Sequence, residues 1–158
     1  MRNILFLVGL FLASGASSAA PAASDPLDFQ LTALDGSSVS IAGFRGKWLV
    51  LNYWATWCLP CVKEFPELDH FDQSNAEVTV LGLNFEDGEL ARIHKFLARH
   101  PVHYQILRVN VYDPPEALGA PMALPTSFIV NPQGHLVKTI IGPVTKQSLS
   151  EAINKLKT

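Results

Sequence analysis

Residues 48–66 read Trp48-Leu-Val-Leu-Asn-Tyr-Trp-Ala-Thr-Trp-Cys-Leu-Pro-Cys-Val-Lys-Glu-Phe-Pro66, and this stretch decides the fold. Its first seven residues form an apolar, aromatic-rich run of strand length. Farther on, Phe65, Leu68 and Phe71 recur at a spacing that predicts a helix over residues 64–71. The pattern therefore predicts a buried strand that leads directly into a helix, with a Cys-x-x-Cys pair on the turn between them.

The position of the two cysteines favours a reactive first thiol. The N-terminal end of a helix presents unpaired amides and the positive end of the helix dipole, which stabilise a thiolate and lower the pKa of a cysteine. Cys58 is expected to be exposed at this end, and Cys61 to lie one turn deeper on the same side. Pro60 is tolerated in the first turn, where its missing N–H has no intrahelical partner. Pro66 falls inside the helix and is expected to kink it.

The N-terminus has the three-part layout of a secretory signal. Arg2 precedes an apolar run at residues 4–12, and small residues follow. We expect residues 1–19 to be a signal peptide that is removed, residues 20–26 to be a linker, and the protein to be periplasmic. The alternative is an uncleaved anchor, for which this run is too short to span a bilayer. A lipid anchor is excluded because this region has no cysteine to acylate.

A structural disulfide is one alternative for the two cysteines, because disulfides persist in the oxidising compartments that exported proteins enter. The chain has two cysteines, spaced Cys-x-x-Cys. A disulfide that closes so short a loop removes little chain entropy and contributes little stability. A structural zinc site needs four ligands, and the histidines show no paired ligand spacing. We therefore interpret the two cysteines as a redox pair.

Composition limits the remaining possibilities. A chain of 158 residues corresponds to one domain, long enough to bury a core without staples. It has 12 Lys and Arg against 14 Asp and Glu, for a net charge of −2. Binding to a phosphate backbone needs clustered positive charge, so no nucleic-acid partner is expected.

Residues 48–66 resemble the active-site segment of thioredoxin-fold proteins, and more closely that of the exported TlpA/ResA/CcmG-like thiol-disulfide oxidoreductases. The segment Ala123-Leu-Pro-Thr-Ser-Phe-Ile-Val-Asn-Pro-Gln-Gly134 resembles the family's cis-proline segment, and residues 34–47 resemble the hairpin before its first central strand. The resemblance covers about residues 27–157. It implies an α/β thioredoxin fold, a central mixed β-sheet flanked by helices with an N-terminal β-hairpin extension, over residues 27–158.

The rest of the chain agrees with that fold. The exception is residues 103–122, the poorest match, because residues 109–121 read largely as loop where related proteins usually have a short helix. Five further elements follow from periodicity and capping signals: a strand at 78–85, a helix capped by Asp87 and ending at His100, two strands at 128–131 and 136–141 that form a hairpin, and a last helix capped by Thr145.

The resemblance also implies roles for individual residues. Cys58 would be the attacking thiolate, against the alternative of an inert buried thiol, and Cys61 would be the resolving thiol. Pro125 would be a cis-proline beside the disulfide, against the alternative of a trans loop proline. An extended substrate segment could then pair with the backbone beside Pro125 as a short added strand. The residues expected to contact the substrate are Trp57, Pro60 and Leu124.

One position departs from cytosolic thioredoxin, which has a buried aspartate six residues before the first cysteine that helps to move the proton of the inner thiol. Here the position is Asn52, which does not titrate. Glu64, three residues after Cys61, is the candidate to replace it. The alternative is a first-turn glutamate that only complements the helix dipole. Glu86, at the end of the second strand, is a weaker candidate for the same role.

The implied function is a thiol-disulfide oxidoreductase that reduces disulfides in exported proteins, of the type that acts in cytochrome c maturation or metal-site assembly. It would need no organic cofactor and no metal, act as a monomer, and receive electrons from a membrane donor of the DsbD/CcdA type. One alternative is a DsbA-like oxidase, although the chain lacks the large helical insertion of such proteins. The other is a non-enzymatic Cu(I)-handling protein, although the chain has no Met-rich tract.

Overall fold

The computed structural model describes residues 25–158, so the predicted signal peptide and most of the predicted linker lie outside the described residues. One seven-stranded mixed sheet has the order β2-β1-β5-β4-β3-β6-β7. The strands are β1 (Gln30–Ala33), β2 (Ser38–Ser40), β3 (Trp48–Trp54), β4 (Val78–Asn84), β5 (Gln105–Arg108), β6 (Thr126–Val130) and β7 (Leu136–Ile141). The helices are α1 (Leu59–Ser74), α2 (Leu90–Leu97), α3 (Lys146–Lys157) and a 3-10 helix, η1 (Ile41–Phe44).

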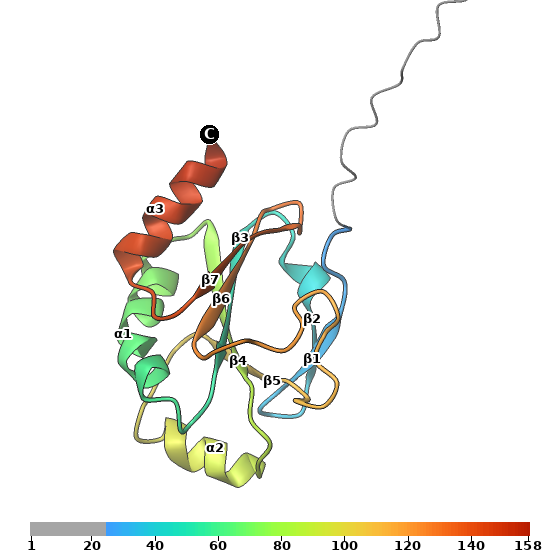
Figure 1. Ribbon diagram of the computed structural model, residues 1–158, viewed down its shortest axis with the longest axis vertical. Coiled ribbons are helices and arrows are strands. Elements are labelled where there is room, and N and C mark those ends of the chain that lie inside the picture. Colours follow the sequence, from blue (N-terminus) through green and yellow to red (C-terminus); the bar gives the residue numbers. More distant parts are fainter. Residues whose placement is uncertain (1–24) are drawn as a thin grey trace, which may run out of the picture.

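Strand β3 lies near the centre of the sheet, and all of its residues are buried. It pairs in parallel with β4 and antiparallel with β6. Parallel neighbours need a crossover connection, and α1 provides it. The chain therefore passes from the C-terminal end of β3 straight to the N-terminus of α1, which is where the cysteines lie (Figure 1).

Alternating side chains of β3 divide the core into two layers. Val50 and Trp54 belong to the layer that includes residues of α1 and α3. Leu51 and Tyr53 belong to the opposite layer, which the N-terminal segment covers. By the same alternation, Asn52 lies on the face covered by α1, among residues that are otherwise apolar.

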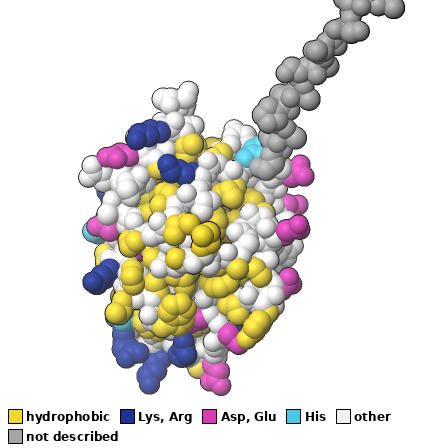
Figure 2. Space-filling model, viewed as in Figure 1, with side chains coloured by type: hydrophobic (Ala, Val, Ile, Leu, Met, Phe, Trp, Pro, Cys, Tyr) yellow, Lys and Arg dark blue, Asp and Glu magenta, His cyan; other side chains and the backbone are white. Residues whose placement is uncertain are grey.

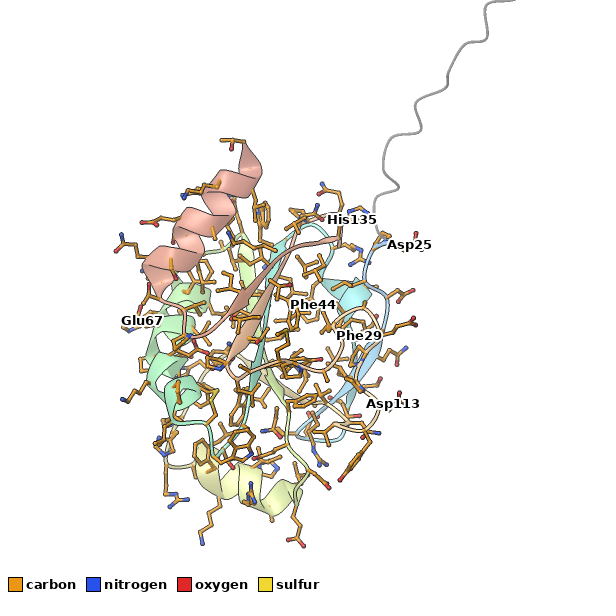
Figure 3. The ribbon with its side chains drawn as sticks, in the orientation of Figure 1. Asp25, Phe29, Phe44, Glu67, Asp113 and His135 are labelled. Carbon is orange, nitrogen blue, oxygen red and sulfur yellow. A yellow bond between two sulfur atoms is a disulfide. The ribbon has the colours of Figure 1, made fainter. Side chains whose placement is uncertain are left out.

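The N-terminal segment closes the second face of the sheet. Phe29 and Phe44, labelled in Figure 3, pack against the apolar layer that contains Leu51. Strand β1 pairs antiparallel with both β2 and β5. The predicted N-terminal β-hairpin extension, the mixed sheet and the flanking helices are therefore confirmed.

One prediction about the middle of the chain is wrong in part. The helix predicted after β4 has Glu89 rather than Asp87 at its N-cap position, without a capping hydrogen bond from the side chain, and it ends at Leu97 rather than His100. Asp87 lies two residues before this N-cap position, and its carboxylate accepts a hydrogen bond from Tyr112 Oη at 2.8 Å. Residues 109–121 contain no helix or strand, as predicted, whereas residues 105–108, for which no element was predicted, form β5.

The other predicted elements are confirmed. Strands β6 and β7 form the expected hairpin, and Thr145 caps α3 through a reciprocal pair of hydrogen bonds with Ser148. Helix α1 starts earlier than the predicted residue 64 and continues past Pro66 to Ser74. Within residues 25–158, no helix has both the length and the apolar character needed to cross a bilayer.

Figure 2 shows one face of the molecule, with charged side chains of both signs around its rim and hydrophobic side chains over much of its centre.

Candidate active site

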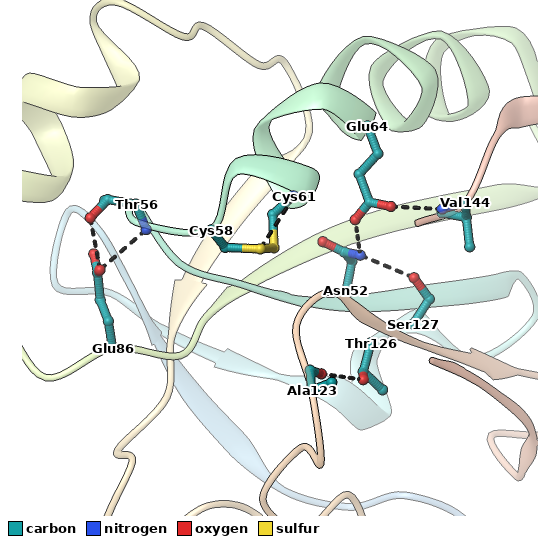
Figure 4. Close-up of a disulfide and its surroundings, with 10 residues drawn as sticks. All are labelled: Asn52, Thr56, Cys58, Cys61, Glu64, Glu86, Ala123, Thr126, Ser127 and Val144. Carbon is teal, nitrogen blue, oxygen red and sulfur yellow. Dashed lines mark hydrogen bonds between the residues drawn. A yellow bond between two sulfur atoms is a disulfide. The ribbon is translucent and has the colours of Figure 1, made fainter. Parts of the chain in front are cut away.

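The two cysteines form a disulfide at the start of α1 (Figure 4). Cys58 is the N-cap residue, and Cys61 lies in the first turn with its Cα 5.3 Å from that of Cys58. Sγ of Cys58 accepts a hydrogen bond from the N–H of Cys61 at 3.3 Å. Pro60 occupies the first turn, as predicted. A helix N-terminus thus directs an amide donor at Sγ of Cys58, which favours negative charge on that sulfur.

The exposure of Cys58 differs from the prediction. Its residue is only 4% exposed, and Cys61 is 0% exposed. The disulfide and the amide of the first turn hold Sγ of Cys58 against the helix, so the oxidised protein shows little of this sulfur. Trp57, 65% exposed, and Leu59 lie on either side of Cys58 and form an apolar rim around it. The order of burial still makes Cys58 the more accessible of the two sulfurs.

Glu64 is buried one turn after Cys61, with 2% of its surface exposed. Its carboxylate accepts hydrogen bonds from Asn52 Nδ2 and from the N–H of Val144, both at 2.8 Å. Burial raises the pKa of Glu64 from 4.5 to about 7, against the opposing effect of these two donors. The alternative of an ordinary glutamate that only complements the helix dipole therefore does not describe it.

Asn52 links Glu64 to the sheet. Its amide Nδ2 donates to Glu64 Oε1 and, at 3.0 Å, to Ser127 Oγ. Ser127 faces Asn52 across the β3–β6 pair and is fully buried. The carbonyl Oδ1 of Asn52 is buried and has no hydrogen-bond partner. The sequence indicates Asn52 as a departure from thioredoxin, but it does not indicate Ser127 and Val144, whose contacts come from the C-terminal part of the chain.

The peptide bond between Leu124 and Pro125 is cis, as the resemblance implied. This segment leads into β6, and Thr126 Oγ1 donates to the carbonyl oxygen of Ala123 at 2.7 Å. Figure 4 places Ala123 and Thr126 on the side of the site opposite α1. The pairing of a substrate with the Leu124 backbone stays a prediction.

An open groove of about 380 Å³ runs beside the cysteine turn. Its rim carries two strongly exposed apolar side chains, Trp57 and Met122, the latter 90% exposed. The residues that line it are Trp57, Phe85, Glu86, Asp87, Val111, Pro121, Met122, Ala123 and Leu124. The groove thus brings together Trp57 and Leu124, two of the three residues expected to contact a substrate.

Glu86 contacts the cysteine turn but not the cysteines. Its Oε2 accepts hydrogen bonds from Thr56 N–H at 3.2 Å and Thr56 Oγ1 at 2.8 Å, and pairs with Arg92 Nη2 at 3.0 Å. Its other oxygen accepts from Asn84 Nδ2 at 3.3 Å. These contacts fix the turn before Cys58 to the end of β4. The geometry favours Glu86 as a clamp on the turn over a proton acceptor for the buried thiol.

No group of three or more His, Cys, Asp or Glu side chains within residues 25–158 is arranged to hold a metal ion. The reactive groups of the described site are the two sulfurs, and Glu64 is the neighbouring titratable group.

The chain is similar to characterised thiol-disulfide oxidoreductases. The Redoxin family matches residues 16–156. The thiol-disulfide oxidoreductase ResA of Bacillus subtilis (strain 168) is 30% identical over 138 residues, which cover 85% of this chain and 75% of ResA. ResA of Halalkalibacterium halodurans is also 30% identical, over 145 residues that cover 89% of this chain and 80% of that protein.

Solved structures agree. A DsbF homologue from Corynebacterium diphtheriae is 26% identical, with a TM-score of 0.69 over 93% of this chain and 99% of that one. A thiol:disulfide interchange protein from Chlorobium tepidum TLS shares the fold, with a TM-score of 0.71 at 22% identity over 87% of this chain and 98% of that one. Since both the family match and the ResA relatives span more than four fifths of the chain, it belongs to the Redoxin family, as a thioredoxin-fold thiol-disulfide oxidoreductase of the TlpA/ResA/CcmG-like group.

Proposed function

We propose that this oxidoreductase works as a reductase of disulfides in exported proteins, with Cys58 as the attacking thiolate. The Cys58 thiolate attacks one sulfur of the substrate disulfide, whose other sulfur leaves with the electron pair and takes a proton. Cys61 then loses its proton and attacks Sγ of Cys58, which releases the second substrate sulfur as a thiol. Two electrons pass to the substrate, and the disulfide between Cys58 and Cys61 remains.

Glu64 is the proton acceptor for Cys61 in this scheme. Cys61 is fully buried, so bulk water has no direct access to its proton. A carboxyl group whose pKa lies at about 7 exchanges protons readily near neutral pH, and Glu64 lies one helical turn away on the buried face of α1. The transfer takes place directly or through one water molecule.

The observation that carries the reducing direction is this buried carboxyl group behind the disulfide. A strong oxidant such as DsbA owes its high potential to stabilisation of its reduced form. Negative charge on Glu64 opposes thiolate formation at the neighbouring cysteines, because like charges in a buried site repel. This repulsion favours the disulfide form and thus lowers the reduction potential of the pair.

The groove beside the turn is proposed as the substrate site. Trp57 and Pro60 flank the disulfide, and Leu124 lines the opposite wall beside cis-Pro125. An extended substrate segment would pair with the backbone of Leu124 as a short added strand, while its side chains contact the exposed apolar rim. This arrangement would present the substrate disulfide to Cys58.

We also propose the cellular setting that the sequence indicates. Residues 1–19 would act as a signal peptide for export to the periplasm, residues 20–26 as a linker, and residues 27–158 as a monomeric catalytic domain. A membrane donor of the DsbD/CcdA type would return electrons to the pair after each turnover. The substrates would be exported proteins in cytochrome c maturation or metal-site assembly.

The reduction potential of the pair tests the direction. The protein is equilibrated with dithiothreitol buffers of known potential, and the fraction of reduced Cys58 and Cys61 is measured by alkylation and mass shift. A reductase should titrate near thioredoxin, at about −270 mV, or below. A midpoint near that of DsbA, at about −120 mV, would refute the reductase and favour the oxidase.

A further inference from the structure

The side-chain oxygen of Asn52 has no hydrogen-bond partner in the oxidised protein. The residue is fully buried, and this oxygen is its carbonyl Oδ1. A buried carbonyl without a donor is unfavourable, and nearly all such groups in folded proteins are paired. Either this oxygen is unpaired in every state of the protein and only destabilises the fold, or it accepts a hydrogen bond in another state of the protein.

The orientation of the amide is fixed by its other end. Nδ2 has two hydrogens, and both are taken, one by Glu64 Oε1 at 2.8 Å and one by Ser127 Oγ at 3.0 Å. A flipped amide would lose both of these bonds and would turn its oxygen toward the carboxylate of Glu64, which has no hydrogen to donate above its pKa of about 7. Oδ1 is thus held on the side away from Glu64 and Ser127.

That side is the side of the disulfide. Asn52 shares a face of β3 with Val50 and Trp54, in the same core layer as Cys61. Cys61 and Glu64 lie one turn apart on the buried face of α1, and Glu64 contacts the nitrogen end of the amide. In Figure 4 the oxygen of Asn52 points toward the disulfide, while its nitrogen points away from it.

In the disulfide, Cys61 has no hydrogen on its sulfur and donates nothing. Reduction adds a hydrogen to this sulfur, which turns it into a buried S–H donor. We propose that Asn52 is a positioning residue whose Oδ1 accepts a hydrogen bond from the thiol of Cys61 in the reduced protein. Oδ1 of Asn52, which has no partner in the oxidised protein, then has the Cys61 thiol as its donor in the reduced protein.

This hydrogen bond would do two things for the exchange reaction. It would keep the proton on Cys61 until the mixed disulfide has formed, so that Cys58 and not Cys61 reacts first. It would also hold the sulfur of Cys61 in one orientation beneath α1. Asn52 does not take up the proton itself, because a carboxamide does not titrate, so Glu64 remains the proton acceptor in the proposed reaction.

The direct test is infrared spectroscopy of the S–H stretch, a band that falls where protein absorbs little else. In reduced Cys58→Ser protein the band reports Cys61 alone. A hydrogen-bonded S–H absorbs at a lower frequency than a free one, so we expect a lowered band that shifts upward in the double variant with Asn52→Leu. If the band has the same frequency with and without Asn52, the proposal is wrong.

A second measurement needs no substitution and so does not depend on the folding of a variant. The side-chain carbonyl carbons of Asn52 and Asn84 are followed by NMR in labelled wild-type protein before and after reduction. Asn84 is the matched control, because it is also buried, with an Oδ1 that lacks a partner, on the neighbouring strand β4. Only the Asn52 carbon should shift as a carbonyl that gains a hydrogen bond.

If the two carbons respond alike, or neither responds, Asn52 does not accept a bond from the thiol. The inference rests on the proposed function only in that the pair must pass through a dithiol state. Because dithiothreitol reduces the protein in both experiments, their failure would leave the direction of exchange open. A high reduction potential would conversely leave the Asn52 bond intact.

Discussion

Replacing Glu64 with glutamine should stabilise the oxidised protein at alkaline pH and destabilise it slightly at acid pH. Burial raises the pKa of Glu64 from 4.5 to about 7 in the folded protein. The unfolded chain exposes this side chain, which then titrates near its ordinary value. Between these two pKa values the folded protein binds the proton and the unfolded chain does not, so the free energy of unfolding falls as the pH rises.

The magnitude follows from the shift. At about 1.4 kcal/mol per pKa unit, a rise from 4.5 to about 7 means that the wild type loses about 3 kcal/mol of its free energy of unfolding across this window. Glutamine does not titrate. It keeps an acceptor for Asn52 Nδ2 but loses one of the two oxygens, so the N–H of Val144 is left without its partner at a cost of about 1 kcal/mol.

The variant should therefore be about 1 kcal/mol less stable than wild type at pH 4 and about 2 kcal/mol more stable at pH 8. Urea unfolding of both proteins at pH 4, 6 and 8, with the disulfide intact, measures this crossover. Glu67→Gln is the matched control: it lies one turn later on α1, is not buried, and also accepts a backbone hydrogen bond, from Lys146 at 2.9 Å. The control should show no crossover, and parallel pH profiles for wild type and Glu64→Gln would refute the reasoning.

Three further predictions concern the sulfurs, the turn and the sheet. Cys61→Ser should trap mixed disulfides through Cys58 on non-reducing gels of periplasmic extract, whereas Cys58→Ser should trap few; equal trapping would show that the roles are misassigned. Glu86→Ala leaves the donors of the cysteine turn unpaired, so it should lower the free energy of unfolding in urea by about 2 kcal/mol and slow disulfide reduction. An unchanged reduction rate would mean that the reaction does not need this clamp. Gly82→Ala places a Cβ 2.5 Å from Ile106 Cδ1 and should lower the free energy of unfolding by about 1–3 kcal/mol, which thermal unfolding would detect.

Sequence periodicity predicted the central strands well, because β3, β4 and β6 are long apolar runs buried on both faces. It failed at β5, which has four residues and lies between β4 and β1. Ile106 and Leu107 point to opposite layers of the core, and both are buried. A pair of adjacent apolar residues among polar ones gives neither a strand alternation nor a helical period, so no element was predicted at these residues.

The site residues that lie close together in the sequence could be predicted, whereas those that distant segments contribute could not. The cysteines and Glu64 lie within one short stretch, so spacing alone placed them on one helix end. The hydrogen-bond partners of Glu64 and Asn52 lie far away in the sequence. Ser127 is 75 residues from Asn52, and Val144 is 80 residues from Glu64. A local signal existed for Asn52, which is a polar residue inside a strand that is otherwise apolar, where a polar side chain needs a buried partner. Ser127 gave a weaker signal, because it follows a second polar residue, Thr126, at the start of β6.

These buried polar groups bear on function because they weaken the fold. Glu64 lies where an apolar side chain would avoid the cost of desolvating a carboxylate, and Asn52 has an oxygen left unpaired. Glu64 and Asn52 lie together on the buried side of the disulfide and not in separate parts of the core. In the proposed reaction Cys61 loses a proton to Glu64, so the rate should follow the pKa of Glu64, at about 7, and not the higher ordinary pKa of a thiol. The pH dependence of disulfide reduction should accordingly move in Glu64→Gln, even where that variant is the more stable protein.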